Sequence, residues 1–146
     1  MQTVAIVGVG LIGGSFALAL KKAGFGGRII GVSSPRTLEA ARARGAIDQA
    51  ASLKEAVPVA DLVYLAQPIR RILDTIEEID PLLKPGALVT DAGSTKSEIV
   101  AHAGRFIRAA QFLGGHPMAG KEQRGAEAAD PDLFAGRTYV LTPRSP

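Results

Sequence analysis

The first twenty residues place a glycine-rich turn between an apolar run and an apolar segment with helical character. The run Val4–Val7 is followed by Gly8, Gly10 and Gly13 in the spacing GxGxxG, and then by the mainly apolar stretch 14–20. The spacing is weak evidence by itself, but between a buried strand and a helix it is the pattern of a dinucleotide-binding turn. We therefore predict a strand, a tight turn and a helix over residues 11–22.

Each part of this turn has a predicted role. Gly8 allows the turn, Gly10 lets the backbone approach a pyrophosphate without an intervening Cβ, and Gly13 lets the helix lie close to the strand. The phosphates would meet the backbone N–H groups at Leu11 and Ile12, where the helix dipole favours an anion. The alternative is a glycine-rich turn that only packs.

Length, cysteine count and charge exclude several classes of protein. The 146 residues suit one domain, and the absence of cysteine excludes disulfides and thiolate metal sites, so no metal site is predicted. The net charge of +3 comes from scattered basic residues, which argues against nucleic-acid binding and would suit an anionic cofactor or substrate. No export signal and no apolar run of about 18 residues are present, so we expect a cytoplasmic protein without a membrane partner.

The segment after the second predicted strand bears on the choice of cofactor. Arg28–Val32 completes a βαβ unit, and an acidic residue at its end would bind the adenosine ribose and repel a 2′-phosphate. Ser33, Ser34 and Arg36 stand there instead, with no carboxylate before Glu39. Hydroxyls and a guanidinium match a phosphate, so we predict NADP in preference to NAD. Ser34 would also cap the following helix, and a solvated Arg36 is the alternative.

The remaining chain continues the alternation of strands and helices. The patterns predict helices over 35–44, 52–57, 67–79 and 97–108, and strands over 46–48, 60–66, 87–90 and 136–143, with a linker at 144–146. These elements predict an α/β fold of the Rossmann type, with a doubly wound, mostly parallel sheet and helices on both faces.

The end of the strand at 60–66 is expected to face the cofactor. Ligands of doubly wound sheets sit outside the carboxyl ends of the strands, so Ala66, Gln67 and Pro68 are predicted to line the crevice. Arg70 and Arg71 follow, either as a second anion contact or, as we favour, as an exposed pair on the polar face of a helix.

Two later segments carry groups suited to chemistry. Ser94 follows a predicted strand and either contacts a ligand or caps the next helix, while Asp91 is a turn former. His116 stands between glycines and a proline, where an irregular backbone at a strand's end would give a core histidine little packing, so we favour a catalytic role. The other histidine, His102, falls in mid-helix without a polar cluster and is expected at the surface.

Four segments in order resemble the prephenate and arogenate dehydrogenases of tyrosine biosynthesis, and the resemblance extends from Val4 to Pro143. They are GVGLIGGS at 8–15, TDAGSTK at 90–96, GGHPMAG at 114–120, and LF at 133–134 with VLTP at 140–143. The sequence GVS at 31–33 resembles the NADP-using, arogenate-preferring branch, in agreement with the missing acid.

The resemblance implies an oxidative decarboxylation. A cyclohexadienol transfers hydride from C4 to the nicotinamide, its C4 hydroxyl loses a proton, and carbon dioxide leaves as the ring becomes aromatic. The resemblance assigns to His116 the hydrogen bond to that hydroxyl, which suits an imidazole near neutral pH. It makes Ser94 the partner of that histidine, Lys96 a contact to an anionic group, and Glu122 a gating or substrate contact, although Lys121 departs from the family's usual threonine.

The family's first domain is followed by a helical domain that forms the dimer and supplies substrate-binding groups. We expect residues 1–146 to be the NAD(P)-binding Rossmann domain without that second domain, able to bind cofactor but with little or no turnover. The full-length protein is expected to be a homodimer acting on a small molecule. Two alternatives remain: another Rossmann hydroxyacid or imine dehydrogenase, and a non-catalytic dinucleotide-binding module.

Overall fold

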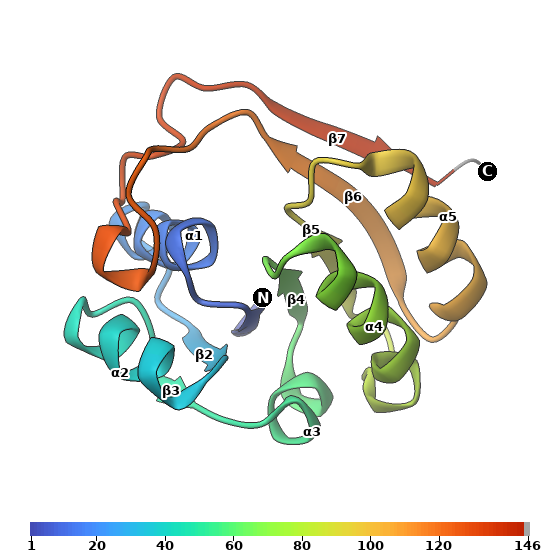
Figure 1. The fold of residues 1–146 in the computed structure, drawn as a ribbon. Coiled ribbons are helices and arrows are strands. Elements are labelled where there is room, and N and C mark those ends of the chain that lie inside the picture. The colour runs from blue at the N-terminus through green and yellow to red at the C-terminus, as the bar shows by residue number, and fades with distance from the viewer. Residues whose placement is uncertain (145–146) are drawn as a thin grey trace.

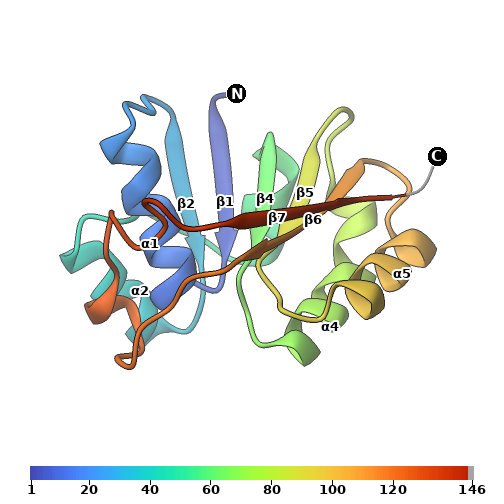
Figure 2. The ribbon, with the colours of Figure 1, turned by 90° about the horizontal axis from the view of Figure 1, so that it is seen from above.

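A seven-stranded sheet forms the centre of the domain in a computed structural model that describes residues 1–144 (Figures 1 and 2). The strand order is β3-β2-β1-β4-β5-β6-β7, and every neighbouring pair is parallel except β6 with β7. The strands are β1 Thr3–Val7, β2 Arg28–Val32, β3 Gln49–Ala50, β4 Leu62–Leu65, β5 Leu88–Asp91, β6 Gln111–Pro117 and β7 Tyr139–Pro143. The order reverses at β1, which creates a crevice between the ends of β1 and β4. This arrangement confirms the predicted Rossmann-type fold.

Helices cover both faces of the sheet and enclose two apolar cores. The α-helices are α1 Leu11–Lys22, α2 Pro35–Ala43, α3 Leu53–Ala56, α4 Ile69–Ile79 and α5 Lys96–Phe106, and short 3₁₀ turns occupy η1 Val57–Val59, η2 Asp80–Leu82 and η3 Ala126–Ala128. Ala17 of α1 and Ala41 of α2 belong to one core, whereas Ile72 of α4 and Ile99 of α5 belong to the other. Figure 1 shows α1 and α2 on one side of the sheet and α4 and α5 on the other. No helix within residues 1–144 combines the length and apolar character needed to cross a membrane.

The central strands and α4 form for reasons visible in the sequence. Every residue of β1 and β4 is buried, as expected for parallel strands covered on both faces. The α4 helix begins directly after Pro68, and Ile72, Ile76 and Ile79 recur at helical spacing on its buried face. Local pattern and burial therefore agree at the centre of the fold.

The strand predicted at 46–48 is misplaced, because β3 is Gln49–Ala50. The Ala46 N–H closes back on the Ala41 carbonyl at 2.9 Å, and Ala46 and Ile47 are buried in the turn that follows α2. These apolar residues fill the core although they lie in a turn. A short apolar run has the same appearance in a buried turn and in a strand, so the sequence could not separate the two.

The irregular backbone predicted around His116 is also wrong. His116 lies within β6 and pairs with Val140 of β7. The neighbouring glycine serves close packing, since a Cβ on Gly115 would lie 2.6 Å from the Asp91 carbonyl oxygen.

The segment 118–138 leaves β6, crosses to α1 and α2, and returns as β7 (Figure 1). The Asp130 N–H donates to the buried Ser15 hydroxyl of α1 at 2.9 Å, and Arg44 donates to the Ala129 carbonyl. A Cβ on Gly14 would lie 3.0 Å from Ala129 Cβ. The small residues Gly14 and Ser15 therefore allow the segment 118–138 to pack closely against α1. Of the predicted linker at 144–146, Ser145 and Pro146 lie outside the described residues.

Candidate functional site

The glycine turn requires glycine at two positions, Gly8 and Gly13. Gly8 has φ +90°, and a Cβ there would lie 2.7 Å from the Ala66 carbonyl oxygen. A Cβ on Gly13 would overlap the Gly8 carbonyl oxygen. Gly8 donates its N–H to the Val32 carbonyl at 2.8 Å, which ties the turn to β2. The predicted roles of Gly8 in the turn and of Gly13 in close helix packing match this geometry.

Gly10 differs from both neighbours because a Cβ placed on it would meet nothing within 4 Å. It is the N-cap of α1, and it offers the first-turn N–H groups no side-chain oxygen. Unpaired N–H groups and the positive end of the helix dipole suit a phosphate. The open space at Gly10 is the space that a pyrophosphate would fill, so the turn fits a dinucleotide.

A cavity of about 640 Å³ opens beside this turn, at the carboxyl ends of β1, β2 and β4. No carboxylate is found among the described residues that line it. Those residues are Val7, Gly8, Gly10, Val32, Ser33, Ser34, Thr37, Ala66, Gln67, Pro68 and Arg71. Seven of the predicted cofactor residues thus share one cavity, while Leu11, Ile12 and Gly13 form the adjacent first turn of α1.

The polar lining differs from the predicted cofactor contacts at three positions. Arg36 is exposed on the first turn of α2 and is not among the lining residues, whereas Arg71 of α4 is among them. Thr37 also faces the cavity. Arg70 and Arg71 are both exposed, as the favoured interpretation predicts, and Arg71 also lines the cavity, as the alternative of a second anion contact requires.

The serines after β2 hold the backbone around the cavity. The Thr37 N–H donates to the Ser34 hydroxyl oxygen at 3.4 Å, so Ser34 caps α2 as the alternative interpretation proposed. The Val9 N–H donates to the Ser33 hydroxyl oxygen at 3.4 Å. On the opposite wall, the buried Thr75 hydroxyl donates to the Gln67 side-chain oxygen at 2.8 Å and fixes its orientation.

The candidate reacting groups follow two neighbouring parallel strands. Ser94 is exposed in the loop after β5, Lys96 is the first residue of α5, and His116 is half-buried near the end of β6. The register pairs Thr90 with Leu113, so the ends of β5 and β6 meet at one edge of the sheet. The structure thereby places the Ser94 loop and His116 on adjacent strand ends. Ser94 is not the helix cap, because that position belongs to Thr95.

A buried carboxylate connects these two segments. Asp91 is fully buried, and its Oδ2 accepts the Gly93 N–H at 2.8 Å while its Oδ1 accepts the Gly115 N–H at 3.1 Å. Lys96 forms an ion pair with Oδ2, and its side chain is only 13% exposed. Burial lowers the pKa of the Lys96 ammonium, and the Asp91 carboxylate opposes that shift. Asp91 is a turn former as predicted, but its bond across to β6 was not foreseen.

A family model described as "Prephenate dehydrogenase, nucleotide-binding domain" matches residues 16–146. The chain belongs to the prephenate dehydrogenase family. The match begins inside α1 and includes β5, β6 and the segment between β6 and β7. The resemblance found in the short sequence segments is confirmed.

Relatives and solved structures from this family cover nearly the whole chain. A prephenate dehydrogenase of Lactococcus lactis subsp. cremoris is 43% identical over 99% of the chain, which spans 42% of that protein. The structure of Aquifex aeolicus prephenate dehydrogenase with hydroxyphenyl propionate and NAD⁺ has a TM-score of 0.89 at 36% identity, over 98% of this chain and 51% of that one. Synechocystis arogenate dehydrogenase has a TM-score of 0.88 at 39% identity, over 97% and 50%.

A pair of aromatic hydroxyls closes the core of this prephenate dehydrogenase family domain near β7. The hydroxyls of Tyr64 and Tyr139 lie 3.0 Å apart, and burial raises the pKa of both phenols, which keeps them neutral. Phe16 of α1 stacks on Tyr64 with ring centroids 3.9 Å apart, and Phe134 meets Tyr139 edge-on at 6.3 Å. These rings join α1, β4 and β7 into one unit.

Glu122 and His102 lie away from the cavity. Glu122 is exposed in the segment 118–138 and is not among the cavity's lining residues, so its substrate role stays a prediction. His102 is not the surface residue predicted, because its side chain is only 19% exposed. Its ring packs on Phe106, and its Nε2 lies 3.0 Å from Glu77 Oε1, within ion-pair distance but not aligned for a hydrogen bond.

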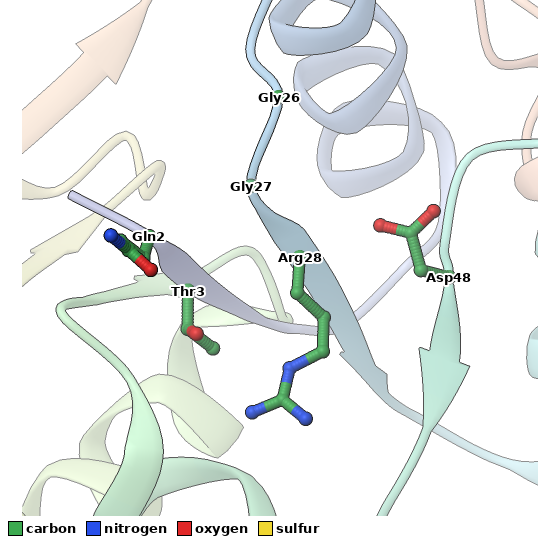
Figure 3. Close-up of a pocket in the computed structure, with 6 residues that line it drawn as sticks. All are labelled: Gln2, Thr3, Gly26, Gly27, Arg28 and Asp48. Atoms are coloured by element: carbon green, nitrogen blue, oxygen red, sulfur yellow. The ribbon is translucent and has the colours of Figure 1, made fainter.

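A second hollow, of about 560 Å³, opens at the amino ends of β1 and β2 (Figure 3). Its polar groups already have protein partners: Asp48 accepts the Ile29 N–H at 2.8 Å and pairs with Lys21 at 2.9 Å, and Arg28 donates to Gln49 at 3.3 Å. Ligands of such sheets bind at the carboxyl ends, so the candidate site is the cavity beside Gly10.

Proposed function

We propose that this domain binds the nicotinamide dinucleotide of a dehydrogenase in tyrosine biosynthesis that oxidatively decarboxylates prephenate or arogenate. The observation that carries the proposal is the juxtaposition at one sheet edge. The open glycine turn and its cavity follow β1, and the Ser94 loop and His116 follow β5 and β6 of the same sheet. The Aquifex relative has NAD⁺ and hydroxyphenyl propionate bound, which supports both the proposed nicotinamide cofactor and the proposed class of aromatic substrate or product.

The cofactor would extend along the carboxyl edge of the sheet. Its pyrophosphate would lie at Gly10, on the N–H groups of Leu11, Ile12 and Gly13. Its adenosine half would lie in the cavity, between the end of β2 and Gln67. When bound, the nicotinamide supplies the acceptor for the hydride that leaves substrate C4.

We favour NADP over NAD for this cavity. A 2′-phosphate would find hydroxyls on Ser33, Ser34 and Thr37, the guanidinium of Arg71, and no lining carboxylate to repel it. Arg36, one turn away on α2, would contribute long-range attraction from an exposed position. The NAD⁺ in the Aquifex relative belongs to that protein, so the preference stays a prediction for this chain.

The protein side of the chemistry falls to three residues. His116 would accept the proton of the substrate's C4 hydroxyl, and Ser94 would hydrogen-bond that hydroxyl or the imidazole. Lys96 carries a positive charge at the same strand ends, with Asp91 as its partner. As carbon dioxide leaves, the electron pair of the broken C–C bond would pass through the ring to the C4 oxygen, and the proton held by His116 would return to that phenolate, so this step needs orientation of the substrate rather than a further proton donor.

We further propose that the complete enzyme is a homodimer and that residues 1–146 turn over substrate poorly by themselves. The chain spans 42% of the Lactococcus relative and about half of the Aquifex and Synechocystis chains, at 51% and 50%, so their remaining parts have no counterpart in this sequence. Substrate contacts made by such parts would be missing from this domain.

Binding and turnover separate this proposal from a non-catalytic module. Calorimetric titration of residues 1–146 with NADP and NAD should show binding of both, with NADP tighter. Spectrophotometric assay of the full-length gene product with prephenate and with arogenate should show reduction of the cofactor. Binding without turnover of either substrate would favour a sensing or assembly module, and no binding would refute the cofactor role.

A further inference from the structure

Asp91 is fully buried next to the candidate reacting groups, yet the proposed chemistry gives it no step. Its carboxylate accepts hydrogen bonds from two segments that are 22 residues apart in sequence. One is the loop that carries Ser94, through the Gly93 N–H at 2.8 Å, and the other is β6, through the Gly115 N–H at 3.1 Å. Gly93 directly precedes Ser94, and Gly115 directly precedes His116.

A carboxylate is the side chain that this position requires. Both oxygens are engaged, Oδ1 by Gly115 and Oδ2 by Gly93 and Lys96, so three donors converge on one buried anion. An ionised carboxylate accepts at both oxygens, whereas an asparagine amide accepts at one and donates at the other. An amide would therefore leave at least one buried donor unsatisfied, which costs more than the bond contributes.

The surroundings leave the two segments little freedom to compensate. A Cβ on Gly115 would lie 2.6 Å from the Asp91 carbonyl oxygen, and a Cβ on Gly93 would lie 2.5 Å from Ile99 Cδ1. The Thr90 hydroxyl donates to the Leu113 carbonyl at 2.5 Å, and β7 holds β6 from its other side. Because Thr90 and β7 hold β6 in place, loss of the Asp91 carboxylate would instead release the exposed Ser94 loop, which would shift relative to His116.

We infer that Asp91 is a positioning residue, whose buried carboxylate fixes the distance between the Ser94 loop and His116 at the carboxyl edge of the sheet. The inference rests on the proposed function for its catalytic consequence. Asp91 exchanges no proton with substrate, and it acts only through Gly93, Gly115 and Lys96. Its loss would lower turnover because misplacement of reacting groups by about 1 Å can cost roughly 100-fold in rate.

The chain offers a matched control at the opposite edge of the sheet. Asp61 also accepts two backbone N–H groups, those of Gln2 at 2.7 Å and Thr3 at 2.9 Å, and it also pairs with a lysine, Lys84. It touches neither candidate reacting segment. The Asp61 side chain is 27% exposed and that of Asp91 is fully buried, so Asp61→Asn reports the loss of such a carboxylate where water can reach its donors, and Asp91→Asn reports it at the buried site.

The experiment measures both variants in the full-length gene product with the better of prephenate and arogenate. Turnover is expressed per cofactor site found by titration, so that unfolded protein does not count. We expect Asp91→Asn to lower kcat by roughly 10- to 100-fold with the Kd for cofactor changed less than about threefold. Asp61→Asn should leave kcat within about twofold of wild type, because its partners lie at the other edge.

Amide hydrogen exchange in residues 1–146 supplies a readout that is independent of activity. Asp91→Asn should accelerate exchange at Gly93 and Gly115, and Asp61→Asn should accelerate it at Gln2 and Thr3. If Asp91→Asn does not fold, Asp91→Glu keeps the charge and moves the oxygens by one methylene, and it should lower kcat in the same direction.

Three results would overturn the inference: a folded Asp91→Asn with wild-type kcat, an equal loss of kcat in Asp61→Asn, or unchanged exchange at Gly115. Failure of the proposed function has a different signature, namely a wild-type protein that binds cofactor and turns over neither substrate. In that case faster exchange at both Gly93 and Gly115 still supports the role of Asp91 in holding the two segments, and unchanged exchange refutes it.

Discussion

The amino ends of the strands (the amino edge of the sheet) and their carboxyl ends (the carboxyl edge) each hold an aspartate with the same kinds of partner, but these partners differ in what they carry. Asp61 at the amino edge and Asp91 at the carboxyl edge each accept two backbone N–H groups and pair with a lysine. The N–H donors of Asp61 belong to residues 2 and 3, at the start of a single strand. Those of Asp91 belong to two segments that each carry a candidate reacting group. The same set of contacts therefore ties down the start of one strand at Asp61 and bridges two segments of the candidate site at Asp91.

The hollows at the two edges differ in the same way. At the amino edge, Asp48 and Arg28 already have partners within the protein. At the carboxyl edge, Gly10 opens onto space, and the N–H groups that follow it have no side-chain cap. The candidate site therefore differs from the hollow at the amino edge in having hydrogen-bond donors without protein partners, and not in its volume.

His116→Asn should produce the largest difference between the edges. We expect it to lower turnover of the full-length protein by roughly two to four orders of magnitude, because the proton of the substrate hydroxyl loses its acceptor. The cofactor Kd should change little, since His116 does not line the cavity. Steady-state kinetics and calorimetry measure the two quantities.

His102→Asn is the matched control for the histidine, because His102 packs on Phe106 of α5 and faces Glu77 of α4. It should leave kcat within about twofold of wild type, as expected for a site that touches no reacting group. Normal turnover in His116→Asn would remove this residue from the chemistry and with it the proposed reaction.

Gly10→Ala tests the space at the carboxyl edge. Its Cβ would meet no protein atom within 4 Å, but its φ of −83° with ψ of −144° lies outside the main allowed regions for alanine, so the thermal midpoint should fall while the domain still folds. The methyl group would occupy the proposed pyrophosphate position and raise the Kd for cofactor by roughly 10- to 100-fold, equivalent to an overpacking cost of about 1–3 kcal/mol. Gly26→Ala, beside the amino-edge hollow and equally open, should not change that Kd. Equal affinities in both variants would place the cofactor elsewhere.

Arg71→Ala and Arg36→Ala distinguish the guanidinium that lines the cavity from the one that does not. We expect Arg71→Ala to raise the Kd for NADP by roughly fivefold, equivalent to about 1 kcal/mol for a partly exposed ion pair, and to leave the Kd for NAD unchanged. Arg36→Ala should have the smaller effect. The reverse order would restore the assignment made from sequence, and no effect from either would count against NADP preference.

Asp61→Asn should have the smallest effect, and it should depend on pH. The hydrogen bond from Lys84 and those from Gln2 and Thr3 lower the pKa of the Asp61 carboxyl below its ordinary value of 3.8. A group with a lowered folded-state pKa contributes stability above its unfolded pKa and loses it as pH falls toward the folded value. The variant should therefore melt below wild type at pH 7, by less than about 4 °C, and the difference should shrink below about pH 4.

Calorimetric melting curves recorded between about pH 2.5 and 7 measure this difference in thermal midpoint. Asp132→Asn serves as the control, because its pair with Lys22 is on the surface and half-exposed at 57%. A gap between wild type and Asp61→Asn that stays constant with pH would contradict the assignment of the ionised carboxylate.

Features with local causes were predictable from sequence. The α1 helix occupies the predicted residues 11–22, because the glycine turn before it and the apolar spacing within it are contained in one stretch. The Ser34 cap and the buried β1 and β4 follow from equally local patterns. The crevice position of Ala66, Gln67 and Pro68 followed from the general placement of ligands at strand ends.

Features with distant causes were not predictable. The Asp91 bond to Gly115 joins residues 24 apart, and the sequence alone does not show that β5 and β6 are in register there. Ile47 looked like strand because a buried turn and a short strand have the same composition. Arg71 lines the cavity because of how α4 is rotated about its axis. Packing of the buried face of α4 against the sheet sets that rotation, and the helix sequence alone does not show it.

β7 determines the shortest piece of this gene that can be moved into a chimera or a cofactor sensor with its site intact. Its residues Val140 and Tyr139 pair with His116 and Pro117, and the Tyr139 hydroxyl reaches Tyr64 in the core. A product trimmed before Tyr139 would expose the histidine strand as a free edge, open to pairing with strands of other molecules. The downstream cloning boundary therefore has to lie beyond Pro143.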